Sequence, residues 1–250
     1  MLQKSFCHLK GITIKKEQKI WKLGLTSWHE LLEKIDEISF LKDNELLKNQ
    51  LEDSIFYYEK GLVRNFHKMF PVAETWRLYN NFKHKTAFLD IETNGLSSYS
   101  YITTVSVANS QTPEIKTFIR NINLSELIDY LEEFDVLVTF NGNTFDLPII
   151  ERIFQHKLTH FCIDLRYVLA SLGFKGGLKS IEKQLGINRN ELDGVDGAMA
   201  VELWNQYYYS GRQDALELLV RYNQADTYNM IELLDLACEL KKELYEEYFP

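Results

Sequence analysis

Hydrophobic positions follow two different periods in the chain after residue 85. Short runs of apolar and β-branched residues are typical of strands, and apolar residues at helical spacing predict amphipathic helices. The pattern predicts strands at 86–91, 101–108, 114–120, 135–140 and near 159–164, and helices at 124–133, 146–156, 197–209, 212–240 and near 178–185. Three successive strands followed by alternating helices and strands predict an α/β fold, with a mixed sheet and helices on its faces.

The first 80 residues show only helical spacing. One helix is predicted up to Leu23, a second from Glu30 to Ile38 with a cap at Ser27, and a third over 44–70. We therefore divide the chain into a small helical N-terminal region, residues 1–80, and an α/β domain, residues 81–250.

A short segment of the N-terminal region, His8-Leu9-Lys10-Gly11-Ile12, precedes a predicted helix. It resembles a helix-hairpin-helix, a motif that binds DNA phosphates. The resemblance is degenerate, because Thr13 stands where a second glycine is expected. We favour the simpler interpretation, a helical cap that only packs on the α/β domain.

The composition is that of an ordinary globular protein of 250 residues. No apolar run is long enough for a membrane span, and the first residues lack the apolar stretch of a signal peptide. The cysteines, Cys7, Cys162 and Cys238, are scattered and odd in number, which indicates reduced thiols and a cytoplasmic protein.

Two carboxylates stand two residues apart at the end of the first predicted strand. Asp90 and Glu92 therefore project from the same face of that strand. Adjacent carboxylates repel unless a cation lies between them, and hard divalent ions such as Mg²⁺ prefer such oxygen ligands. The pair predicts a metal site.

Two further acidic residues lie in suitable places. Asp146 follows the turn Asn141-Gly142-Asn143 and is expected at or near the start of a helix. Tyr222 and Asp226 lie four residues apart in the last predicted helix, so their side chains share one helix face.

Together, these three segments resemble the motifs of the DEDD 3′-to-5′ exonucleases, in the ribonuclease H-like superfamily. Asp90 and Glu92 match the first motif, an Asp-x-Glu. The second motif is matched by Asn141, Phe145 and Asp146, and the third motif of the tyrosine subgroup, Tyr-x-x-x-Asp, by Tyr222 and Asp226. The resemblance covers most of residues 70–238, and the bacterial YprB-like branch is similar at 76–79, 162–166, 176–182 and 194–198.

The resemblance implies a mixed five-stranded ribonuclease H-like sheet and hydrolysis of nucleic acid at a single-stranded 3′ end by two Mg²⁺ or Mn²⁺ ions. It implies Asp90 as the bridging ligand, with Glu92, Asp146 and Asp226 completing the metal site. Tyr222 would orient the attacking water, since a phenol with a pKa near ~10 is a poor base at neutral pH. The residues expected to contact the substrate are Asn141, Phe145 and Lys179, the last at a helix N-terminus suited to phosphate.

The net charge of −8 is unusual for a nucleic-acid enzyme, but it is unevenly distributed. Residues 1–85 hold 15 Lys and Arg against 11 Asp and Glu, a net +4, and the remainder holds 13 against 25, a net −12. Metal ions would offset part of the acidic charge, and the N-terminal part is compatible with a phosphate backbone.

Alternative interpretations stay open at this stage. Taken singly, Asp146 is explained as a helix cap, Lys179 as an exposed lysine and Phe145 as a core residue. The same carboxylates also serve ribonuclease H-like endonucleases, and a non-catalytic nucleic-acid-binding or scaffold protein is a further alternative. His156 and His160 are predicted to be surface residues. The sequence does not separate DNA from RNA substrates or indicate an oligomeric state.

Overall fold

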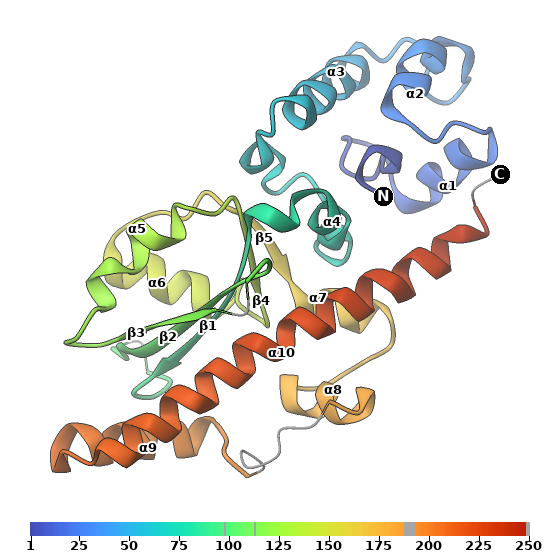
Figure 1. The fold of residues 1–250 in the computed structure, drawn as a ribbon. Coiled ribbons are helices and arrows are strands. Elements are labelled where there is room, and N and C mark those ends of the chain that lie inside the picture. Colours follow the sequence, from blue (N-terminus) through green and yellow to red (C-terminus); the bar gives the residue numbers. More distant parts are fainter. Residues whose placement is uncertain (98, 113, 188–193, 249–250) are drawn as a thin grey trace.

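The computed structural model describes residues 1–97, 99–112, 114–187 and 194–248. In this part of the chain, one five-stranded sheet has the order β3-β2-β1-β4-β5 (Figure 1). The strands are β1 (Thr86–Thr93), β2 (Ile102–Asn109), β3 (Ile115–Ile119), β4 (Val136–Thr139) and β5 (Phe161–Asp164). β1 pairs antiparallel with β2 and parallel with β4, β2 pairs antiparallel with β3, and β4 pairs parallel with β5. The predicted mixed five-stranded sheet with flanking helices is confirmed.

The helices were predicted better in the α/β domain than in the N-terminal region. The α-helices are α1 (Ile14–Lys22), α2 (Trp28–Lys34), α3 (Glu45–Glu59), α4 (Tyr79–Phe82), α5 (Leu127–Leu131), α6 (Asp146–Phe154), α7 (Leu165–Ser171), α8 (Leu178–Leu185), α9 (Gly197–Ser210) and α10 (Gln213–Glu246). Short 3₁₀ turns are η1 (Leu2–Lys4), η2 (Ile35–Glu37), η3 (Val63–Phe66), η4 (Val72–Leu78), η5 (Lys83–Lys85) and η6 (Leu124–Glu126). The helix predicted over 44–70 was wrong beyond Glu59, where Gly61 takes a positive φ of 65° and turns the chain.

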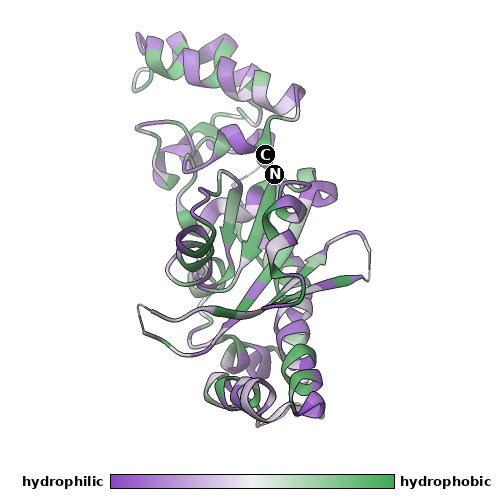
Figure 2. Ribbon diagram, turned by 90° about the vertical axis from the view of Figure 1, so that its left-hand side faces the viewer, coloured by the Kyte–Doolittle hydropathy of each residue, from purple (hydrophilic) through white to green (hydrophobic). Residues whose placement is uncertain are grey.

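The two faces of the sheet pack against different helices. Alternate residues of β1 belong to different core clusters: Phe88 packs with the N-terminal region, α7 and α10, whereas Ala87 and Leu89 pack with α5 and α6. This is the strand period of two, with both faces covered. Figure 2 shows mostly hydrophobic strands between helices that combine hydrophobic and hydrophilic residues. Asp90 and Glu92 therefore project from the face of β1 that α10 covers.

The N-terminal region packs directly on the α/β domain. One hydrophobic cluster includes Trp21 and Trp28 from the N-terminal region, Phe161 from β5 and Leu234 from α10. Helix α10 passes along the sheet and ends beside the N-terminal helices, near the start of the chain (Figure 1). The predicted boundary near residue 80 stays a prediction, but the two regions share a core.

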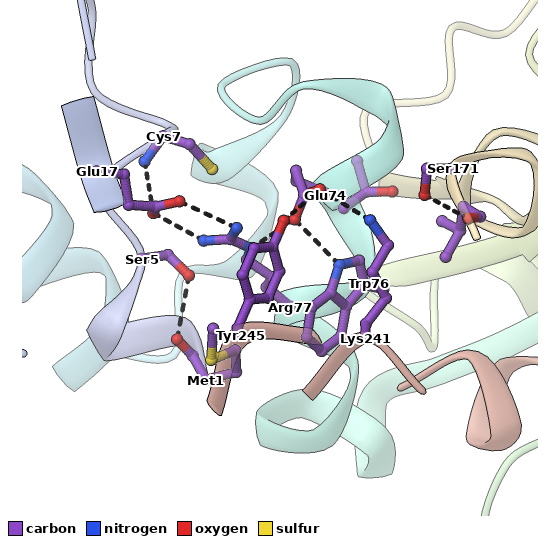
Figure 3. Close-up of polar contacts among 12 residues, drawn as sticks. Met1, Ser5, Cys7, Glu17, Glu74, Trp76, Arg77, Ser171, Lys241 and Tyr245 are labelled. Atoms are coloured by element: carbon purple, nitrogen blue, oxygen red, sulfur yellow. Dashed lines mark hydrogen bonds and ion pairs between the residues drawn. The ribbon is translucent and has the colours of Figure 1, made fainter. Parts of the chain in front are cut away.

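A buried ionic network joins the N-terminal region to the end of α10 (Figure 3). The Arg77 guanidinium donates to both carboxylate oxygens of Glu17, at 2.7 and 3.0 Å, and to Glu74 at 2.8 Å. Lys241 and Tyr245 of α10 each donate to the other oxygen of Glu74 at 2.9 Å. Two cations and two anions are thus paired within the core, as buried charge requires.

His160, predicted to be a surface residue, is fully buried. It immediately precedes β5, and its Nε2 donates to the carbonyl oxygen of Leu131 at 2.9 Å. The prediction was wrong because a turn residue is exposed only where no other segment covers it. Among the described residues, no helix is both long and apolar enough to cross a membrane.

Candidate active site

The acidic site lies where α10 crosses β1. Asp90 and Glu92 extend the face of the strand on which Phe88 is buried, and Asp226 meets them from the helix. One carboxylate oxygen from each of the three residues lies within 4.8 Å of the other two. Residues 136 apart in sequence are thus brought within the reach of a single cation.

The carboxylates strongly affect one another's ionisation. Burial, followed by the charges of Asp226 and Asp146, raises the pKa of Glu92 to about 8, whereas nearby Lys179 lowers it. Burial and the same two neighbours, together with Glu92, hold the pKa of Asp90 well above its usual value. Like charges gathered in a partly desolvated site favour protons or a metal ion.

Asp146 begins α6 and lies against β1 from the side opposite α10. It is buried, and its Oδ1 accepts the backbone N–H of Ile91 at 3.2 Å, between the two acidic residues of the strand. Burial raises the pKa of Asp146 to about 7, although this hydrogen bond lowers it. Its carboxylate is outside the set of three within 4.8 Å, but it is close enough to raise the pKa of both Asp90 and Glu92.

Asn223 is a site residue that the sequence analysis missed. Its side chain is fully buried, and its Nδ2 donates to Asp90 Oδ2 at 2.7 Å and to the Asp90 carbonyl oxygen at 3.1 Å. It therefore fixes the position of one carboxylate and connects α10 to β1. The only sequence signal was an amide residue directly after Tyr222.

Tyr222 lies beside the carboxylates and is also buried. Burial, the charges of Asp226, Glu92 and Asp90, and a hydrogen bond to Asp226 all raise its pKa above the usual value. The phenol therefore keeps its proton at neutral pH and acts as a donor. Lys179 Nζ lies 4.4 Å from the centre of the Tyr222 ring and also donates to the carbonyl oxygen of Val195.

The turn that carries Asn141 is held by Asp164 at the end of β5. The two oxygens of Asp164 accept the backbone N–H groups of Asn141 at 2.8 Å and Asn143 at 3.2 Å. Gly142 is required here, because a Cβ atom at this position would lie 2.2 Å from Thr139 Oγ1. Asn141 takes a positive φ of 65°.

The side chain of Asn141 is held as firmly as its backbone. Its Oδ1 accepts from Arg166 Nη1 at 2.7 Å and from Thr144 Oγ1 at 3.0 Å. The turn therefore presents a fixed amide beside the carboxylates.

A cleft of about 390 Å³ opens onto the carboxylates. Asp90, Glu92 and Asp146 line it together with Asn141 and Phe145, and the start of α9 forms another wall. Phe145 also packs on the hydrophobic core beneath α6, so the residue contacts both the core and the cleft. Tyr222, Asp226 and Lys179 do not line this cleft. They adjoin it through the acidic cluster.

The ligand set suits a hard divalent cation. Oxygen atoms of carboxylates are the ligands that Mg²⁺ and Mn²⁺ prefer, and no cysteine or histidine belongs to the cluster. The sequence-predicted ligands Asp90, Glu92 and Asp226 are brought together, with Asp146 adjacent. Their roles as ligands stay predictions.

Comparison with known proteins gives one family match and one similar solved structure. The family described as the RNase_H superfamily matches residues 87–238. The structure of the family B DNA polymerase from the hyperthermophilic archaeon Pyrobaculum calidifontis is similar over 62% of this chain and 24% of the polymerase chain, with 19% identity and a TM-score of 0.49. No relative among curated proteins matches the sequence.

Proposed function

The chain belongs to the RNase H superfamily, and we propose that it is a metal-dependent 3′-to-5′ exonuclease of single-stranded nucleic acid, of the tyrosine subgroup of the DEDD enzymes and their YprB-like branch. The observation that carries the proposal is the convergence of Asp90, Glu92 and Asp226 within 4.8 Å, beside a buried tyrosine. A cluster of like charges costs folding free energy, so a protein with only a structural need would gain by replacing it.

In the proposed site, Asp90, Glu92 and Asp226 would hold the Mg²⁺ or Mn²⁺ ions of a two-metal mechanism. Asp146 would complete the site from α6. Bound divalent ions stabilise the charge of the phosphodiester transition state and lower the pKa of water. Asn223 fixes the Asp90 carboxylate through its hydrogen bond of 2.7 Å.

Tyr222 would orient the attacking water by a hydrogen bond. Its pKa lies above the usual value, so the phenol is no base at neutral pH, and the proton of the water has to leave by another route. Lys179, 4.4 Å from the ring centre, contributes the nearby positive charge that lowers the pKa of Glu92. In the proposal, Lys179 also attracts the substrate phosphate.

The cleft would hold the 3′-terminal nucleotide. Phe145 offers a ring face to a base, and the Asn141 amide, held by Arg166, offers donors beside the carboxylates. Both residues line the same cleft as Asp90, Glu92 and Asp146. DNA and RNA strands both offer phosphates and aromatic base faces to these contacts.

The proposal is tested by incubating 5′-labelled single-stranded DNA and RNA with the protein in Mg²⁺, Mn²⁺ or EDTA. We expect hydrolysis with either metal, none with EDTA, and none by the Asp90→Ala variant. Lys19→Gln, at an exposed position on α1, is the matched preparation control, and it should cleave like the wild type. Hydrolysis that persists in EDTA, or in Asp90→Ala within tenfold of the wild-type rate, would refute the metal site.

A further inference from the structure

A second hollow lies on the other side of the Asn141–Phe145 turn, between the N-terminal region and the α/β domain. Two cavities, of about 270 and 170 Å³, share the residues His67, Lys68, Asn143 and Cys162 as lining. One extends along η4 toward Thr75, and the other runs along α6 toward Lys157. The two cavities adjoin through these four shared residues, and we call them together the lateral groove.

The lateral groove is lined by apolar and polar residues, and its charged lining residues are two lysines and one carboxylate. Lys68 and Lys157 are exposed, and within the part of the chain that the structure describes neither ammonium group has a hydrogen bond or an ion pair. The one carboxylate in the lining, Glu151, accepts the backbone N–H of Leu158 at 2.9 Å. The lining thus holds two lysines against one carboxylate, whereas the protein as a whole carries a net charge of −8.

His67 adds to this character. Its Nδ1 donates to the carbonyl oxygen of His160 at 2.7 Å, which fixes the ring against the start of β5. Nε2 forms no hydrogen bond with any described residue. The ring therefore adds a polar atom to the lining of the groove.

The lateral groove and the cleft share one wall. Asn141 and Phe145 line the cleft, and Asn143, between them in the same turn, lines the groove. Asp164 holds this turn through the backbone N–H groups of Asn141 and Asn143. A chain whose terminal unit lies in the cleft reaches the groove by crossing a single turn.

We propose that the lateral groove binds the phosphate backbone of the substrate strand, several nucleotides from the 3′ end held in the cleft. The inference rests on the proposed function for the direction of the strand. The observations that select a polyanion are the two unneutralised lysines and the continuity with the cleft. The N-terminal region, which supplies His67, Lys68 and Thr75, then forms part of the substrate-binding surface as well as a cap on the core.

The lining of the groove also identifies which segment of the N-terminal region would contact the strand. The segment at residues 8–12 that resembles a helix-hairpin-helix is not part of the lining. Its Lys10 backbone N–H donates to Gln50 Oε1 at 2.9 Å, and the Gly11 carbonyl accepts from Lys16 Nζ at 2.9 Å, which are contacts within the region. The linker between η3 and η4 is the segment that faces the strand.

The test measures binding of fluorescent single-stranded DNA and RNA by anisotropy. The full chain carries Asp226→Asn so that the strand is not consumed. Strands of about 15 and about three nucleotides are compared, since sites on single-strand-binding proteins span about 4–16 nucleotides. The variants are Lys68→Gln with Lys157→Gln, and Lys19→Gln as the control with one lysine lost outside the groove.

We expect the double variant to bind the long strand on the order of tenfold more weakly at low salt. We also expect the slope of log K against log salt to fall by about 1.4, because each phosphate contact on a single strand contributes about 0.7. The loss for the short strand should be much smaller. The Lys19→Gln control should bind strands of both lengths as tightly as the Asp226→Asn chain without a further substitution.

Equal losses for the two lengths, or a long-strand affinity within twofold of the control, would overturn the lateral-groove inference. This outcome is separable from failure of the proposed function, because binding is measured without hydrolysis. If the wild-type protein cleaves no strand but binding depends on length through Lys68 and Lys157, the proposed nuclease function is refuted and the lateral-groove inference stands.

Discussion

The carboxylates of the acidic site lie close enough together to change one another's pKa values. Asp90 and Glu92 were predicted to share a site from the strand period alone, and Tyr222 and Asp226 from the helix period, since both periods are local properties of the backbone. Asn223 was not predicted. Its bond to Asp90 depends on which side of α10 faces β1, and that is a tertiary relationship.

The pKa values of the acidic cluster predict how the metal-free protein responds to pH. The pKa of Glu92 is raised from 4.5 to about 8, so the folded state retains a proton that the unfolded state has lost. The contribution of Glu92 to the free energy of unfolding is therefore fully present below pH 4.5 and is lost as the pH rises through about 8. Asp146, with a pKa raised to about 7, contributes in the same direction.

We expect Asp226→Asn to reduce this pH dependence. Removing the carboxylate removes the largest charge that raises the pKa of Glu92, so the metal-free variant should melt at a higher temperature than the wild type at pH 8. At pH 4.5 the difference should shrink. The measurement is thermal denaturation in EDTA at both pH values, and a variant less stable than the wild type at pH 8 would contradict the repulsion.

Replacing Tyr222 by Phe isolates the phenol. The ring packing and the carboxylates stay, and one donor is lost. Loss of a group that positions the attacking water typically costs about 10²–10⁴-fold in rate. Metal affinity should change little, whereas Asp226→Asn, one turn away, should weaken it. Single-turnover cleavage with a metal titration of both variants measures this. A Phe variant that cleaves at the wild-type rate would make Tyr222 a packing residue.

At the scale of elements, the strands and most helices were predicted from their periods, and the predicted cap at Ser27 is observed at the start of α2. α7 was missed because it follows β5 without a turn, where Asp164 ends the strand and its side chain caps the helix through the N–H of Arg166. α8 was predicted with its observed bounds, and the Asp196 side chain caps α9 by accepting the N–H of Met199. α10 extends past residue 240 because its last turns pack on the N-terminal region.

Helix α10 connects the active site to the N-terminal region through the buried ionic network at its end. Breaking this network should lower the free energy of unfolding. Lys241→Met leaves Glu74 with one cation fewer in a buried site, and we expect a loss of about 3 kcal/mol in the free energy of unfolding. The exposed neighbour Lys242→Met is the matched control, with a change within about 0.5 kcal/mol. Chemical denaturation measures the free energy of unfolding of both variants. Equal values would show that the network contributes nothing to stability.

At the scale of the whole molecule, the N-terminal region is built into the α/β domain. The shared cluster that contains Trp21, Phe161 and Leu234, and the Arg64 guanidinium bonded to Asp135 at 2.9 Å, span the predicted boundary near residue 80. The sequence could not show this, because helical spacing identifies an apolar face but not its partner. The favoured interpretation of a packing cap describes these contacts, and the lateral groove adds a role in binding.

The central claim is that the acidic site removes nucleotides from a free 3′ end, and its most direct test compares two forms of one sequence. A 5′-labelled linear strand and a covalently closed circle are incubated with the protein and Mg²⁺ or Mn²⁺, and products are resolved by length. We predict a ladder that shortens from the 3′ end and releases mononucleotides, with the circle intact. Cleavage of the circle at the rate of the linear strand would contradict the account and indicate an endonuclease.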